Sequence, residues 1–137
     1  MKYGGIHMTF GEYIKTSDWK KEKHVPVIEA PTKVKKGEPF MVTAAIGKEV
    51  AHPNTTEHHI RYISLFFKPK DGPFVFNLGR CEFCAHGESP EGPNTGPAYT
   101  HHSATFVVSL SAPGTLHAIS FCNIHGLWED EREIAVE

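Results

Sequence analysis

Short runs of aromatic and β-branched residues, separated by glycine and proline, dominate the chain from residue 25 onward. Few stretches show helical periodicity, so this pattern predicts strands rather than helices. Turn-forming pairs such as Lys36-Gly37 and Pro113-Gly114 separate the candidate strands. The expected strands cover residues 25–29, 40–46, 59–68, 74–82, 105–111, 115–122 and 133–136. About seven short strands in a chain of 137 residues predict an all-β fold, an immunoglobulin-like β-sandwich.

Two segments depart from the strand pattern. Residues 10–15 allow a short N-terminal helical segment, and residues 85–100 (AHGESPEGPNTGPAYT) are polar and rich in glycine and proline. That composition predicts an ordered surface loop. The sequence has no repeats and no internal linker, and its length allows a hydrophobic core without disulfides. We therefore expect a single domain over residues 1–137.

Charge and cysteine content argue against several classes of protein. Fourteen basic and sixteen acidic residues give a formal net charge of -2, which does not favour nucleic acid or an anionic membrane as a partner. No apolar run approaches the ~20 residues that span a bilayer, and no secretion signal is visible, so we expect a cytoplasmic protein. Three cysteines are too few for a disulfide framework, and any metal site must use other ligands as well.

Those other ligands are available, because ten histidines are many for this length. Three segments combine them with other ligand-type residues: EKHVPVIE (Glu22, Lys23, His24), AHPNTTEHHIRY (His52, His58, His59) and CNIHGLWE (Cys122, His125). Each lies at a predicted strand end or loop, where a sandwich can bring distant segments to one rim. Structural zinc usually takes two or more cysteines. One thiolate with several imidazoles therefore predicts a mononuclear site and favours iron or copper.

Strand alternation limits which of these side chains can meet. Adjacent residues of a strand face opposite ways, so at most one of His58 and His59 should enter a given pocket, and alternation does not say which. Cys81 and Cys84 lie three apart in the segment FNLGRCEFCAHG. If the strand 74–82 continues through this segment, the two cysteines face opposite ways and behave as small core or surface thiols. A nucleophilic role for Cys122 is disfavoured. Catalytic cysteines usually lie at a helix N-terminus, which lowers the pKa of the thiol, and no helix is predicted after Cys122. Gly126 instead predicts a tight turn, with Leu127-Trp128 packed behind it.

Four motifs in the same order, EKHVPVIE, HPNTTEHHIRYI, AHGES with GPNT, and CNIHGLWE, resemble the superoxide reductases. The similarity is to the one-iron class of the desulfoferrodoxin family, also called neelaredoxins, and it extends from about Trp19 to the C-terminus. It implies a mononuclear non-haem iron, cycling between Fe2+ and Fe3+, in a His4Cys site. The implied ligands are His24, His52, His58, His125 and the Cys122 thiolate. It also implies that Glu22 occupies the sixth position of the oxidised iron and that Lys23 is the cation beside that open position.

The resemblance further implies an activity and its partners. The expected reaction is the one-electron reduction of superoxide to hydrogen peroxide, with electrons from rubredoxin or a similar donor, and the expected assembly is a homotetramer. An open cationic site suits an anionic diatomic substrate, because the field of the site steers it inward. The alternative is a non-catalytic sandwich that binds metal for storage or structure, and the Glu22-Lys23 pair argues against it. We expect His7, His86 and His117 to be structural or solvated. His101 and His102, like Cys81 and Cys84, depart from the family pattern; we interpret these departures as neutral variation, the alternatives being an extra thiol chemistry or a second, adventitious metal site on the surface.

Overall fold

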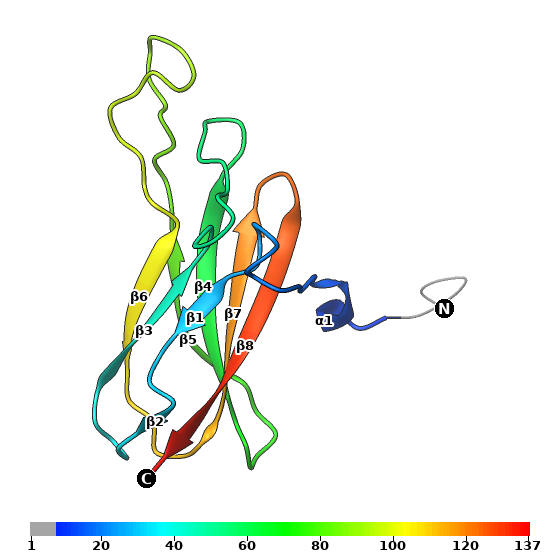
Figure 1. The fold of residues 1–137 in the computed structure, drawn as a ribbon, viewed down its shortest axis with the longest axis vertical. Helices are drawn as coiled ribbons and strands as arrows, with labels where there is room; N and C mark the ends of the chain where they lie inside the picture. Colours follow the sequence, from blue (N-terminus) through cyan, green and yellow to red (C-terminus); the bar gives the residue numbers. More distant parts are fainter. Residues whose placement is uncertain (1–7) are drawn as a thin grey trace.

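The computed structural model describes residues 8–137, which form a β-sandwich preceded by one short helix (Figure 1). Helix α1 (Phe10–Tyr13) lies where the sequence predicts a helical segment. Eight strands follow: β1 (Val27–Glu29), β2 (Lys33–Val34), β3 (Phe40–Ala45), β4 (Ile60–Pro69), β5 (Phe76–Glu82), β6 (Ser103–Val108), β7 (Gly114–Cys122) and β8 (Gly126–Val136). The prediction of an all-β sandwich is confirmed. His7 lies outside the described residues.

The strands form two sheets that pack face to face. One sheet has the order β1-β3-β6, and the other has the order β2-β8-β7-β4-β5. Strand β2 runs parallel to β8, and the other paired strands are antiparallel. Along β7, buried side chains alternate with partly exposed ones from Leu116 to Cys122. This two-residue period is the pattern of a strand with one face on the core.

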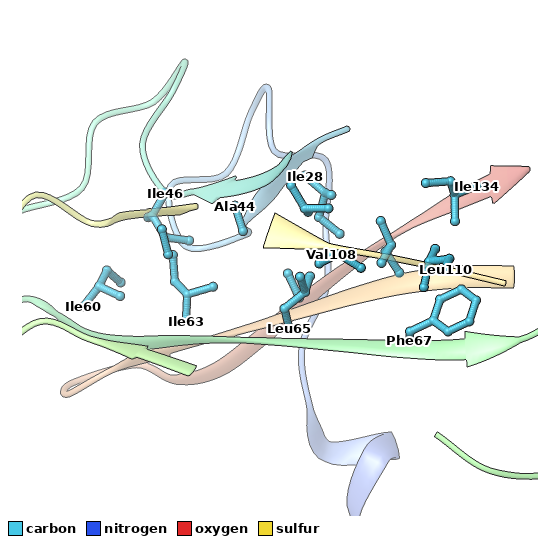
Figure 2. Close-up of a cluster of buried hydrophobic side chains, with 14 of the residues drawn as sticks. Ile28, Ala44, Ile46, Ile60, Ile63, Leu65, Phe67, Val108, Leu110 and Ile134 are labelled. Carbon is cyan, nitrogen blue, oxygen red and sulfur yellow. The ribbon is translucent and has the colours of Figure 1, made fainter. Parts of the chain in front are cut away.

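The hydrophobic core fills the space between the two sheets (Figure 2). Val42 and Ala44 come from the three-stranded sheet, whereas Ile63, Leu65 and Leu116 come from the five-stranded sheet, and all five are fully buried. A register shift between Ile60 and Tyr62 interrupts the pairing of β4 with β7. Such a bulge redirects the following side chains. As a result Ile60 and Ile63, three residues apart, are both buried.

Two parts of the large sheet differ from the prediction. Strand β8 begins at Gly126 instead of residue 133, and the short strand β2 was not predicted. The start of β8, GLWEDERE, is strongly charged and carries little strand signal. It is held instead by continuous pairing with β7, from Gly126 opposite Cys122 to Ile134 opposite Gly114. Tertiary pairing has overridden local preference here.

Several connections gather at one end of the sandwich, away from the C-terminus (Figure 1). They include the segment before β1, the β3–β4 connection, the β7–β8 turn and the long segment between β5 and β6. Residues 85–100 form the expected ordered loop, because Gly96 N donates to Gly87 O (2.9 Å) and Thr100 N donates to Ala85 O (2.7 Å). Among residues 8–137, no helix has the length and apolar character needed to cross a membrane.

Candidate metal centre

The β7–β8 turn brings a cysteine and a histidine together. Strand β7 ends at Cys122 and β8 begins at Gly126, which leaves three residues in the loop. Gly126, the first residue after the loop, has a φ of 82°, a left-handed conformation that glycine adopts without strain. The predicted tight turn is therefore present. It folds His125 back over Cys122, so that the His125 N–H donates to Cys122 Sγ (3.4 Å).

Four ligand-type side chains converge beside this turn. The ligand atoms of His24, His58, Cys122 and His125 all lie within 4.8 Å of one another. His24 Nε2 and His125 Nδ1 are 3.1 Å apart. Two nitrogens that bind one ion at right angles, each at about 2.1 Å, would be about 3.0 Å apart. The pair is thus spaced as two ligands of a common ion.

His52 lies outside that tight group of atoms, but its ring packs between two of the others. The centroid of the His52 ring lies 5.0 Å from that of the His24 ring and 4.8 Å from that of the His58 ring. His125 lies 5.0 Å from His58 and 4.7 Å from His24. The four imidazoles therefore form a closed ring. The His52 and His58 rings lie edge to face, at 75°.

Hydrogen bonds to the outer nitrogens set the tautomers of two of these rings. His24 Nδ1 donates to the Glu22 carboxylate (3.0 Å), and His52 Nδ1 donates to Pro53 O (2.7 Å). Each Nε2 therefore carries a lone pair, as in metal-binding histidines whose other nitrogen is held by a second partner. Nε2 of His52 and Nε2 of His58 are buried and have no hydrogen-bond partner in the described structure. Buried polar atoms are rarely left unpaired, so these two atoms fit a bound cation.

Burial keeps the ring nitrogens in their metal-binding form. It lowers the pKa of His52 to about 4, although the hydrogen bond to Pro53 acts in the opposite direction. The pKa of His58 is also lowered, first by burial and then by the charges of His125 and Lys23. Both imidazoles are therefore neutral at pH 7. A neutral imidazole is the form that binds a metal.

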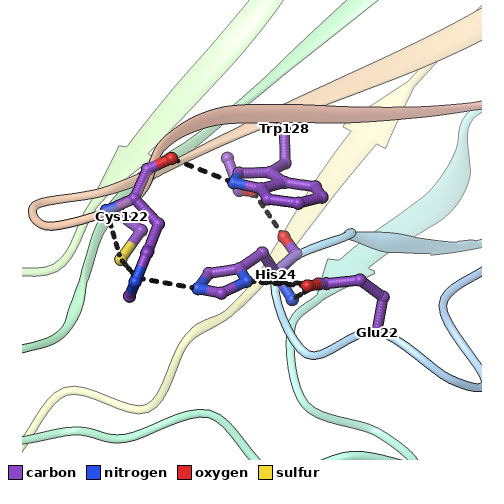
Figure 3. A network of polar contacts seen from close by, with 6 residues as sticks. Glu22, His24, Cys122 and Trp128 are labelled. Atoms are coloured by element: carbon purple, nitrogen blue, oxygen red, sulfur yellow. Dashed lines mark hydrogen bonds and ion pairs between the residues drawn. The ribbon is translucent and has the colours of Figure 1, made fainter. Parts of the chain in front are cut away.

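Glu22 and Lys23 lie beside this ring of imidazoles. Figure 3 shows the Glu22 carboxylate against His24, where it accepts hydrogen bonds from the His24 backbone N–H and from ring Nδ1. Burial raises the pKa of Glu22, but these hydrogen bonds outweigh it and the net pKa is lowered. Lys23 forms no ion pair with any carboxylate of residues 8–137, and its charge contributes to the lowered pKa of His58.

Two further residues, Ser120 and Trp128, contact His24, and neither contact was predicted from the sequence. Ser120 Oγ donates to His24 O (2.9 Å) from the buried row of β7. Trp128 stacks on the His24 ring, with centroids 4.9 Å apart and planes 16° apart, and its Nε1 donates to His125 O (3.2 Å) (Figure 3). The expected packing of Leu127-Trp128 behind the turn thus includes a direct contact with the imidazole ring.

The other histidines of residues 8–137 do not belong to this group of ligand atoms. His59 turns away from His58 and stacks on His86, with centroids 3.5 Å apart, so only His58 of the pair joins the group. Both residues lie before β4, which begins at Ile60, and not in a strand as predicted for His59. His86 is buried, and its Nε2 contacts Phe83 O (2.7 Å), which confirms its structural role. His102 is buried, with its ring 5.9 Å from the His52 ring.

The two other cysteines also lie outside this group. Cys81 lies in β5 and packs against the hydrophobic core, whereas Cys84 is exposed. The prediction that both belong to one strand is wrong for Cys84, because β5 ends at Glu82. Neither thiol belongs to the group of ligand atoms, in agreement with the expectation of small core or surface thiols.

The fold and the site define a β-sandwich protein that carries, at one rim, a group of imidazoles and one cysteine sulfur able to hold a metal. The sequence profile of the family described as desulfoferrodoxin matches residues 16–131. The neelaredoxin of Megalodesulfovibrio gigas is 52% identical over 130 residues, covering 95% of this chain and 100% of its own. The superoxide reductase of Pyrococcus furiosus is 56% identical over 120 residues, covering 88% of this chain and 94% of its own.

The structural comparison agrees with the sequence comparison. A crystal structure of a relative from Thermotoga maritima has a TM-score of 0.93 and 58% sequence identity, and it covers 96% of this chain and 99% of that one. The chain belongs to the desulfoferrodoxin family.

Proposed function

We propose that this protein is a superoxide reductase, an oxidoreductase that reduces superoxide by one electron to hydrogen peroxide. Membership of the desulfoferrodoxin family and the high identity to relatives named superoxide reductase and neelaredoxin support this function. Within this chain, one observation carries the proposal. The imidazoles of His24, His58 and His125 and the Cys122 sulfur meet at a rim, with the His52 ring packed beside His24 and His58. His125 is exposed there and Cys122 is fully buried.

The proposed cofactor is a mononuclear iron in a His4Cys site. Its ligands are His24, His52 and His58 through Nε2, His125 through Nδ1, and Cys122 through Sγ. The two orphaned Nε2 atoms and the 3.1 Å spacing of His24 Nε2 and His125 Nδ1 support this set. Bound iron alternating between Fe2+ and Fe3+ would supply the electron that superoxide receives. A soft thiolate with imidazoles is a donor set suited to iron.

The protein's own residues would admit and orient the substrate. A small anion approaches from the side of His58 and His125, because His24, His52 and Cys122 are buried. The unpaired charge of Lys23 attracts that anion and orders a water that delivers protons to the product. Glu22 is proposed to occupy the sixth position of the oxidised iron. To do so its carboxylate must release the hydrogen bonds to His24.

We extend the proposal to the partners and the setting of the protein. Each superoxide reduced requires one electron from outside, which we assign to a rubredoxin-type donor. The exposed side chains of Met41 and Val107, directly opposite each other on β3 and β6, offer an apolar surface for a homotetramer.

We propose a single domain over residues 1–137. The three free cysteines support a reducing compartment such as the cytoplasm.

Metal analysis combined with a visible spectrum tests the iron site. The oxidised protein should contain one iron and show a thiolate-to-iron charge-transfer band in the red. Cys122→Ser should abolish this band, whereas Cys84→Ser, which changes an exposed thiol outside the ligand group, should retain it. A colourless protein that binds only zinc would refute the proposal and leave metal storage or structure as the function.

The stoichiometry of the reaction tests the activity itself. With a chemical electron donor, a reductase yields one hydrogen peroxide for each superoxide consumed. A dismutase yields one for every two and needs no donor. Measuring peroxide against superoxide consumed, with the donor present and absent, separates the two activities. A yield of one half that does not depend on donor would refute the reductase assignment.

A further inference from the structure

The side chain of Asn123 links the β7–β8 turn to the segment that carries His58. Its Oδ1 accepts a hydrogen bond from His59 N–H (2.9 Å), and its Nδ2 donates to Glu57 O (2.9 Å). The Asn123 backbone N–H also donates to His59 O (3.1 Å). These three bonds attach the turn to the residues on both sides of His58.

The segment around His58 is itself a closed unit. Thr55 Oγ1 accepts a hydrogen bond from His58 N–H (3.0 Å), and Thr55 N–H donates to His58 O (2.9 Å). The His59 ring secures the other side of this unit, because its Nδ1 donates to Thr55 O (2.8 Å). Residues 55–59 therefore have a fixed shape, and only their placement against the β7–β8 turn remains to be set.

Strand pairing cannot set that placement. The ladder between β4 and β7 ends where Ile60 lies opposite Cys122. His58 and Asn123 both lie beyond this last pair. The Asn123 amide thus continues the attachment of the two segments past the end of the sheet, at the point where the ligands are presented.

The His58 ring depends on this attachment more than two of the other rings do. His24 is held through Nδ1 by Glu22, and His52 is held through Nδ1 by Pro53 O. No hydrogen bond from another described residue reaches the His58 ring, and its Nε2 is buried without a partner. The position of this ring therefore follows from the placement of its backbone and from packing.

We propose that Asn123 is a positioning residue of the metal centre, whose amide fixes His58 relative to Cys122 and His125. This inference rests on the ligand set of the proposed function. An amide suits the role because one short side chain must accept from an N–H and donate to a C=O at the same time. Aspartate retains the acceptor but loses the donor, and alanine loses both.

The experiment compares metal release from the full-length wild type, Asn123→Asp and Asn123→Ala. Each protein is loaded with Zn2+ or, anaerobically, with Fe2+, and release into a chelator is followed. Loss of partners that orient a ligand typically costs about 10–100-fold in metal affinity. We expect at least about tenfold faster release from Asn123→Ala and a smaller effect for Asn123→Asp. Asn77→Ala is the matched control, because the exposed Asn77 side chain accepts a hydrogen bond from Gly79 N–H within β5 (3.0 Å) and has no other side-chain bond among the described residues. It should release metal at the wild-type rate.

A double-mutant cycle with His58→Ala separates positioning from general destabilisation. If Asn123 acts through His58, the effect of Asn123→Ala on metal release should disappear in the His58→Ala background. The electron paramagnetic resonance spectrum of the Fe3+ form should also change in Asn123→Asp, even where the thermal stability of the metal-free protein does not. Wild-type release rates from Asn123→Ala, or an equal effect in both backgrounds, would overturn the proposal. A wild type that binds Zn2+ but does not reduce superoxide would refute the proposed function while the cycle still reports on Asn123.

Discussion

Ser120→Ala removes one buried hydrogen bond between segments that are distant in the sequence. Ser120 Oγ donates to His24 O (2.9 Å), and the two residues are only 1% and 4% exposed. The alanine variant leaves the His24 carbonyl without this donor, at a cost of about 1–3 kcal/mol in the free energy of unfolding. For 137 residues, at about 2.1 cal/mol/K each, the entropy of unfolding is about 0.29 kcal/mol/K. The melting temperature should therefore fall by about 3–10 °C.

Circular dichroism melts of the metal-free and the Zn2+-loaded protein test both parts of this reasoning. The loss should be larger with Zn2+ bound, because a displaced His24 binds metal less tightly and a tenfold weaker affinity removes about 1.4 kcal/mol of stabilisation. Ser109→Ala, at an exposed position, should change the free energy of unfolding by less than about 0.5 kcal/mol. Equal losses with and without Zn2+ would refute the positioning of His24, and unchanged melts would refute the buried hydrogen bond.

Three further substitutions test the rim and the sheet. Lys23→Ala should slow the capture of superoxide and reduce its dependence on salt while iron is retained, whereas Lys21→Ala should have a smaller effect. Pulse radiolysis at several ionic strengths measures the capture rate, and a rate unchanged at low salt would contradict steering. Glu22→Ala should retain turnover but alter the ferric visible spectrum, and loss of iron would instead show a structural role. Gly114→Ala places a Cβ against a carbonyl of β4 and should cost about 1–3 kcal/mol in urea unfolding, whereas Gly11→Ala, with open space around it, should not.

Features that depend on local periodicity could be predicted from the sequence. The alternation along β7 places Cys122 at the end of a buried row, and the structure shows this row. The sequence also predicts that at most one of His58 and His59 enters the site, and His59 stacks on His86 instead, although both residues lie just before β4. Gly126 marked the turn because its left-handed conformation is one that other residues rarely adopt. In each case a few neighbouring residues carry the whole signal.

Contacts between distant segments could not be predicted in this way. Ser120 and His24 are 96 residues apart, and their hydrogen bond depends on how the two sheets pack. The start of β8 is charged, so its strand conformation follows from pairing with β7. The role of Asn123 was also hidden, because it depends on where the β4–β7 ladder ends. Resemblance to a family indicates which residues bind a metal, but not what holds those residues in place.

The two sides of the site differ in burial, and this difference bears on the rate at which the site captures an anion. Cys122 continues the buried row of β7 and lies opposite buried Ile60, so its sulfur borders the hydrophobic core. His125 is exposed and His58 is partly exposed, so the site meets water on their side. The capture of a small anion should then depend on the charge near the rim, where Lys23 lies, and therefore on ionic strength.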